Sequence, residues 1–95
     1  MRNLLAFDLG ASNGRAILGQ FDGEQLTMRE LHRFENNYIE MNGVFYWDLP
    51  YLYNQLKQGL LAFKNANVGK LDCIGIDTWG VDYGLLDRNG QLLSN

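Results

Sequence analysis

The sequence predicts an α/β fold in the order β-β-β-α-β, followed by a hairpin. Four Asn-Gly or Asp-Gly pairs, each flanked by apolar segments, indicate tight antiparallel turns. One later stretch carries apolar residues at helical spacing. A chain of 95 residues, 46% hydrophobic and 13% aromatic, is long enough for one modest core. The turn pairs are Asn13-Gly14, Asp22-Gly23, Asn42-Gly43 and Asn89-Gly90.

The first half of the chain predicts an antiparallel meander and a second, short hairpin. The meander strands are expected at residues 3–8, 15–21 and 25–34. The pattern "LTMRELHRF" breaks strict alternation after Met28, which predicts a β-bulge in the third strand. The short hairpin pairs residues 38–41 with 44–47.

A helix is expected directly after "WDLP". Asp48 can cap free backbone N–H groups, and Pro50 fits the first turn, where its missing donor costs nothing. The helix is expected to end near Asn67 to Gly69. Its apolar face follows three-and-four spacing and consists of Leu49, Leu52, Tyr53, Leu56, Leu60 and Phe63.

The last third of the chain predicts one more strand and a final hairpin. "LDCIGID" is interpreted as a strand buried on both faces, with Cys73 as a small core residue. "GVDYGLLDRNGQLL" is interpreted as the hairpin. The chain ends at Asn95, directly after that hairpin, and its single helix covers only one face of the sheet. We therefore expect the rest of the fold to lie beyond residue 95.

Composition excludes several classes of function. The formal net charge is −3 and the basic residues are scattered, which argues against a nucleic-acid partner. One cysteine cannot form a disulfide within the chain. The apolar run near the N-terminus is too short for a signal peptide or a membrane span, so we expect a soluble, cytoplasmic protein with no membrane partner.

The stretch "FDLGASNGR" contains the first candidate site. Between Asp8 and Arg15 every residue except Leu9 is small or turn-forming, so backbone N–H groups can turn together toward an anion such as phosphate. Asp8 could hold hydrated Mg²⁺ beside that phosphate, and Ser12 or Arg15 could add a donor. A simple hairpin with a polar tip remains the alternative. Neither a P-loop nor a dinucleotide-binding fingerprint is present.

The second candidate site is "IGIDTWGVDYGLLDRNGQLL", Ile74 to Leu93. It resembles the segment of FGGY-family carbohydrate kinases in which a strand leads into the sugar pocket and a hairpin follows. "FDLGASNGR", "LHRFENNYIEMNGVFYWDL" and the intervening helix extend this resemblance over essentially all 95 residues. Asn13 stands where the family often has serine, which preserves the turn.

The resemblance implies the fold and the reaction. Residues 1–95 would be the N-terminal part of an actin-like ATPase (ribonuclease H-like) domain, and the second lobe is absent from this chain. The implied activity is Mg²⁺-dependent transfer of the ATP γ-phosphate to the 1-hydroxyl of L-rhamnulose, a step of L-rhamnose catabolism. The catalytic base would be an aspartate further downstream, so the resemblance places none in this chain and implies that the chain alone is inactive.

The resemblance also implies which residues bind the substrates. Asp8 would lie near the metal. The ATP phosphates would meet Ala11, Ser12, Asn13, Gly14 and Arg15. The sugar would meet Thr78, Trp79, Gly80 and Asp82. A glycine lets a hydroxyl approach the main chain, an indole offers an apolar wall, and a carboxylate accepts hydroxyl protons.

Structural roles remain possible at several of these positions. Trp79 can be a core aromatic, Asp77 a brace of the turn and Asp82 a solvated hairpin residue. Trp47-Asp48 is better explained as a helix cap with its packing partner, and His32 as a structural residue. Three functional alternatives also stay open: a kinase for fuculose, xylulose or glycerol, a non-catalytic actin-like nucleotide-binding module, and an independent small protein. The oligomeric state is not predicted.

Overall fold

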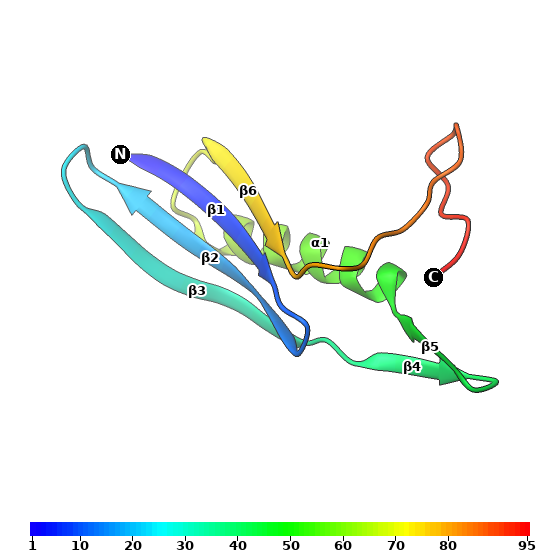
Figure 1. The fold of residues 1–95 in the computed structure, drawn as a ribbon. Coiled ribbons are helices and arrows are strands. Elements are labelled where there is room, and N and C mark those ends of the chain that lie inside the picture. Colours follow the sequence, from blue (N-terminus) through cyan, green and yellow to red (C-terminus); the bar gives the residue numbers. More distant parts are fainter.

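The computed structural model describes all 95 residues as one four-stranded sheet, one helix and a small separate hairpin (Figure 1). The sheet has the order β3-β2-β1-β6 and β4 pairs with β5. Strands β1, β2 and β3 are antiparallel neighbours, and β6 runs parallel to β1. The elements are β1 (Arg2–Leu9), β2 (Asn13–Phe21), β3 (Leu26–Glu35), β4 (Tyr38–Met41), β5 (Val44–Trp47), α1 (Leu49–Ala66) and β6 (Cys73–Thr78). All five strands predicted before the helix are confirmed.

The helix α1 forms where local sequence signals place it. The Asp48 carboxylate accepts a hydrogen bond from the backbone N–H of Tyr51 at 3.2 Å, and Pro50 lies in the first turn. Asn67 ends the helix in the left-handed region at φ 54°, and its N–H donates to the Lys64 carbonyl. The predicted cap and end point are therefore confirmed. This helix is not long and apolar enough to cross a membrane.

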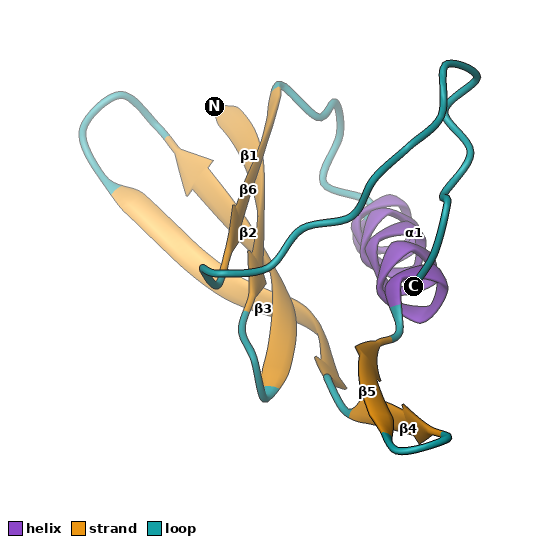
Figure 2. Ribbon diagram, turned by 45° about the vertical axis from the view of Figure 1, so that its right-hand side comes forward, coloured by secondary structure: helices purple, strands orange, loops and turns teal.

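The core lies between α1 and one face of the sheet (Figure 2). The register pairs Leu5 with Leu18 and Phe7 with Ala16, which puts these four side chains on the helix side. Phe63 of α1 completes the buried cluster. The predicted bulge is also present, because Ala16 pairs with His32 and Ile17 pairs with Glu30. The extra residue between them, Leu31, packs against the core.

Gly59 allows α1 to pack directly on the sheet. A Cβ atom at this position would lie 2.5 Å from the Phe7 ring and 3.0 Å from the Ala16 Cβ atom. Although alanine is the better helix former, we expect Gly59→Ala to lower the free energy of unfolding by about 1–3 kcal/mol through overpacking. Urea unfolding measures this effect, with Gly75→Ala as the control because a Cβ atom there meets nothing within 4 Å. A stability gain in Gly59→Ala would contradict this packing.

Of two predictions about the last third of the chain, one is wrong and one is confirmed. Strand β6 was expected to be buried on both faces, but every residue in it is exposed, including Cys73. The reason is its place at the sheet edge, because α1 packs on β1, β2 and β3 and leaves β6 uncovered. The predicted final hairpin is present in a short form: Leu86 and Leu92 form an antiparallel bridge, and the Leu93 N–H donates to the Leu85 carbonyl at 2.9 Å.

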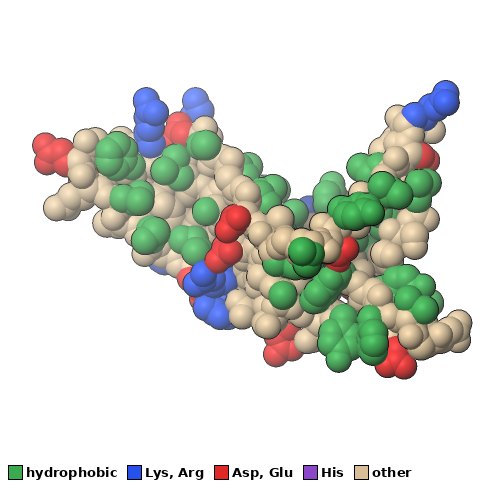
Figure 3. All heavy atoms as spheres, in the orientation of Figure 1, with side chains coloured by type: hydrophobic (Ala, Val, Ile, Leu, Met, Phe, Trp, Pro, Cys, Tyr) green, Lys and Arg blue, Asp and Glu red, His purple; other side chains and the backbone are tan.

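The face of the sheet opposite α1 is open, as the single helix predicted. Figure 3 views the molecule from this side, where hydrophobic side chains are exposed among acidic and basic ones. Met28 and Leu26, which pair with Gly19 and Phe21 of β2, are 72% and 53% exposed. Charged residues occupy the other end of this face, near the turn between β1 and β2.

Candidate functional site

The turn between β1 and β2 is the first part of the candidate site. The N–H of Gly10 donates to the Asn13 carbonyl at 2.8 Å, which closes the turn. Ala11, Ser12 and Asn13 are exposed, and the N–H groups of Ala11 and Ser12 bond to no other backbone group. Exposed N–H groups of this kind can bind an anion. A Cβ atom on Gly14 would overlap the Phe34 ring, so glycine is required where β2 begins.

Asn36 holds this turn from the end of β3, and sequence reasoning missed it. Its side-chain Nδ2 donates to the Gly10 carbonyl at 2.9 Å, and its backbone N–H donates to the Ser12 carbonyl at 3.0 Å. The residue is only 4% exposed. No local pattern marks Asn36, because it reaches partners more than 20 residues earlier in the chain.

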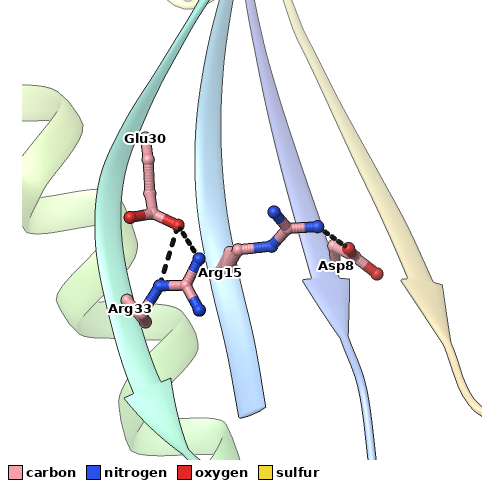
Figure 4. Close-up of polar contacts among 4 residues, drawn as sticks. All are labelled: Asp8, Arg15, Glu30 and Arg33. Carbon is pink, nitrogen blue, oxygen red and sulfur yellow. Dashed lines mark hydrogen bonds and ion pairs between the residues drawn. The ribbon is translucent and has the colours of Figure 1, made fainter.

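A row of charged residues crosses the open sheet face beside the turn (Figure 4). Asp8 pairs in register with Arg15 of β2 and with Asp77 of β6, and Arg15 pairs with Arg33 of β3. An ion pair joins Arg15 to Asp8 at 2.6 Å, with the two side chains 38% and 41% exposed. The hydrogen bond and the charge of Asp8 raise the pKa of Arg15 above its ordinary value. A second ion pair joins Arg33 to Glu30 at 2.8 Å.

This arrangement fits a magnesium ion that is held largely by phosphate. No group of three or more His, Cys, Asp or Glu side chains comes together in the structure. Mg²⁺ needs only one or two carboxylates when phosphate oxygens and water supply the rest of its coordination. The half-exposed Asp8 carboxylate at the end of β1 provides such a hard oxygen ligand, three residues before the first free turn donor, the N–H of Ala11.

A cleft of about 660 Å³ forms the second part of the candidate site. Its walls come from three places that are distant in sequence: the β4–β5 hairpin, the first half of α1, and the loop after β6. Leu9, at the end of β1, also lines the cleft and directly precedes the turn. The two parts of the site therefore meet at the carboxyl ends of the parallel strands β1 and β6, where α/β sheets commonly bind ligands.

The structure brings together three of the four predicted sugar residues. Thr78, Trp79 and Asp82 line the cleft, whereas Gly80 does not, and a Cβ atom on Gly80 would meet nothing within 4 Å. One carboxylate oxygen of Asp82 accepts a hydrogen bond from the N–H of Tyr83 at 2.8 Å. Asp77 lies outside the cleft lining, in the charged row.

Aromatic side chains dominate the cleft. The Trp47 and Trp79 ring centroids lie 4.8 Å apart, so the tryptophan expected to pack beside the helix cap also forms a cleft wall. Tyr38, Phe45, Tyr46 and Tyr53 add further aromatic surface. Few polar groups line this surface, a pattern typical of small-molecule sites.

His32 has the structural surroundings that the sequence predicted. Its Nε2 lies 2.7 Å from the Gln55 side-chain oxygen, and its ring stacks on Phe34. It lines neither the turn nor the cleft.

Comparison with known proteins shows which sequences this chain is similar to. It is 46% identical over 93 residues to a rhamnulokinase from Mannheimia succiniciproducens, which covers 96% of this chain. It is also 46% identical over 94 residues to a rhamnulokinase from Bacteroides thetaiotaomicron, covering 97% of the chain. This chain is related to the rhamnulokinases. It spans 19% of the length of either rhamnulokinase, and no family model matches it.

A solved structure shows the same fold. The ligand-bound xylulose kinase from Lactobacillus acidophilus superposes with a TM-score of 0.77 at 14% sequence identity, over 100% of this chain and 19% of that one. The rhamnulokinase-related chain therefore has a mixed α/β fold that corresponds to part of the actin-like ATPase fold, as its sequence predicted.

Proposed function

We propose that this chain is the N-terminal part of the first lobe of an ATP-dependent sugar kinase that phosphorylates the 1-hydroxyl of L-rhamnulose. The observation that carries the proposal is the 46% identity to rhamnulokinases over nearly the whole chain, because that match includes both the turn and the cleft. The second lobe and the adenine pocket belong to the remainder of such a protein. The cytoplasmic location expected from the sequence is part of the same proposal.

The turn is proposed to bind the phosphates of ATP. Its exposed N–H groups at Ala11 and Ser12 are free to donate, and Arg15 supplies a cation within the same stretch. Asp8 is proposed to hold Mg²⁺, which neutralises charge on the phosphates when bound. Because Asp8 and Arg15 are now paired with each other, both roles require them to exchange partners: Arg15 for phosphate, and Asp8 for the cation.

The aromatic cleft is proposed to bind the sugar. Trp79 and Trp47 offer flat apolar walls to the carbon face of a ketose, while Thr78 and Asp82 can exchange hydrogen bonds with its hydroxyls. Gly80, beside the cleft, leaves open space through which a hydroxyl can reach the main chain. The position of the cleft at the end of β1, next to the turn, favours transfer between a sugar and a phosphate bound there.

The base that accepts the proton of the attacking hydroxyl is proposed to lie outside this chain. Among the carboxylates near the two parts of the site, Asp8 is paired with Arg15 and one oxygen of Asp82 accepts a backbone N–H. The residues of this chain then position the two substrates and stabilise phosphate charge, which are the main contributions to phosphoryl transfer.

A chimera tests this function directly. In it, the chain replaces the matched segment of the Mannheimia rhamnulokinase, so that the relative supplies the second lobe. We expect ATP-dependent phosphorylation of L-rhamnulose at a rate within about tenfold of the intact relative, a loss of no more than ~1.4 kcal/mol of transition-state stabilisation. A relative from which that segment is deleted is the control.

The choice of sugar is tested on the same protein. L-Fuculose, D-xylulose and glycerol are offered to the chimera in parallel with L-rhamnulose. A higher kcat/KM for one of these sugars would move the assignment to that substrate. A folded chimera that binds ATP and phosphorylates none of them would instead support a non-catalytic nucleotide-binding module.

A further inference from the structure

We propose that Asn36 is a positioning residue that fixes the β1–β2 turn in the shape that meets phosphate. The proposal rests on the phosphate-binding role proposed for this turn. Asn36 lies at the junction between β3 and β4, outside both strands, and it does not line the aromatic cleft. It makes two hydrogen bonds to the β1–β2 turn, and together they define the orientation of the turn backbone.

The two bonds act on alternate peptide units. Asn36 Nδ2 holds the Gly10 carbonyl at 2.9 Å, and the Asn36 N–H holds the Ser12 carbonyl at 3.0 Å. In a trans peptide the C=O and the following N–H point in opposite directions. Holding the Gly10 carbonyl toward Asn36 therefore turns the Ala11 N–H away from Asn36, toward the exposed side of the turn. The donor proposed to meet phosphate is thus oriented by a residue that does not itself touch the ligand.

The unpaired side-chain oxygen of Asn36 indicates that this residue does more than stabilise the fold. Asn36 is 4% exposed, and its Oδ1 is buried without a hydrogen-bond partner. Leaving a buried acceptor unpaired costs free energy of folding. The Asn36 side chain therefore destabilises the fold through its Oδ1 atom while its Nδ2 atom holds the turn. Replacing Asn36 by alanine removes both the hydrogen bond to the Gly10 carbonyl and the unpaired oxygen. The Gly10 carbonyl also loses its side-chain donor, so the direct effect falls on the turn, whereas the ladder of hydrogen bonds between β1 and β2 does not involve Asn36.

The segment just before Asn36 is tied to α1. The carbonyl of the preceding residue, Glu35, accepts a hydrogen bond from the Tyr51 hydroxyl at 2.9 Å, and the Tyr51 ring meets Phe34 edge-on. The end of β3 is thereby tied to the first turn of α1. Asn36 is held by the core of the fold, which suits a residue that must orient a flexible turn.

Kinetics of the chimera provide the functional test. We expect Asn36→Ala to raise the KM for MgATP about tenfold, while kcat and the KM for L-rhamnulose stay within about twofold, since one oriented donor contributes on the order of a factor of ten. Asn36→Leu keeps the approximate size of the side chain and brings no charge to this buried position, but it lacks the donor, so it is expected to show the same rise. Asn37→Ala is the matched control, because Asn37 is exposed and bonds only the Glu35 side chain. Unchanged KM for MgATP in both Asn36 variants would overturn the proposal.

Amide hydrogen exchange on the 95-residue chain tests the clamp independently of activity. We expect the Gly10 N–H, which closes the turn, to exchange at least about fivefold faster in Asn36→Ala, while the amides of Leu5 and Leu18 in the core stay protected. An inactive wild-type chimera would contradict the proposed function but leave this measurement valid. Unchanged exchange at Gly10, or loss of protection throughout the sheet in both Asn36 variants, would overturn the positioning role.

Discussion

The purified 95-residue chain is expected to release no ADP in response to L-rhamnulose, even with saturating Mg²⁺ and ATP. The base and the lobe that encloses adenine are both proposed to lie outside it, and its sheet is open on the face opposite α1 (Figure 2). Losing substrate positioning and the exclusion of water costs several orders of magnitude in rate, on the order of 7 kcal/mol or more. Phosphate binding at the exposed turn is expected to be on the order of millimolar, about 4 kcal/mol.

A coupled assay of ADP release measures this directly, with the chimera at equal concentration as the positive control. Sugar-dependent ADP production by the chain alone would show that it contains a base. Asp77 in the charged row and Asp82 in the cleft would then be the first candidates. Alanine variants at these two positions would distinguish between them.

Asp8→Ala in the chimera is expected to lower kcat by about 10²–10³-fold, because Asp8 is the carboxylate proposed to hold the cation beside the transferred phosphate. Its effect on folding is expected to be below about 1 kcal/mol, since the ion pair with Arg15 is largely solvated. The measurement is kcat against Mg²⁺ concentration, together with the KM for L-rhamnulose, which is expected to stay unchanged.

Glu30→Ala is the matched control for Asp8→Ala. Glu30 lies on the same sheet face, is also 41% exposed and is also paired with an arginine, but it lies on β3, away from the turn. If both variants retained full turnover, Asp8 would be removed from the proposed metal site. If both lost turnover equally, the effect would come from the electrostatics of this face rather than from a specific ligand.

Local signals account for the elements that were predicted correctly. Asp48 and Pro50 at one end and Asn67 at the other act within a few residues, so the bounds of α1 follow from nearby backbone groups. Three of the predicted turn pairs likewise form turns through their own backbone angles, with a positive φ at Gly23, Gly43 and Gly90. The pair Asn13-Gly14 was wrongly predicted as a tight turn, because it begins β2 and neither residue has a positive φ. The candidate turn is nevertheless local, since its closing bond joins Gly10 to Asn13.

Burial was predicted less well because it depends on neighbouring layers. The apolar pattern of β6 is that of a strand enclosed on both faces, yet Ile74 and Ile76 are 47% and 61% exposed because no element of this chain covers them. An apolar pattern indicates which side chains a segment can bury. Whether these side chains are buried depends on the elements that pack around the segment.

By itself, the sequence determined the order of elements, the caps of α1, the small-residue turn between β1 and β2 and the relationship to sugar kinases, because each depends on residues close together in the chain. Tertiary structure alone decided the pairing of Asp8 with Arg15, the clamp from Asn36 onto Gly10, and the meeting of Trp47 with Trp79 across the cleft. The physical reason is side-chain reach. A hydrogen bond or a ring contact forms between groups a few ångströms apart, and the strand register and helix packing decide which distant residues come that close.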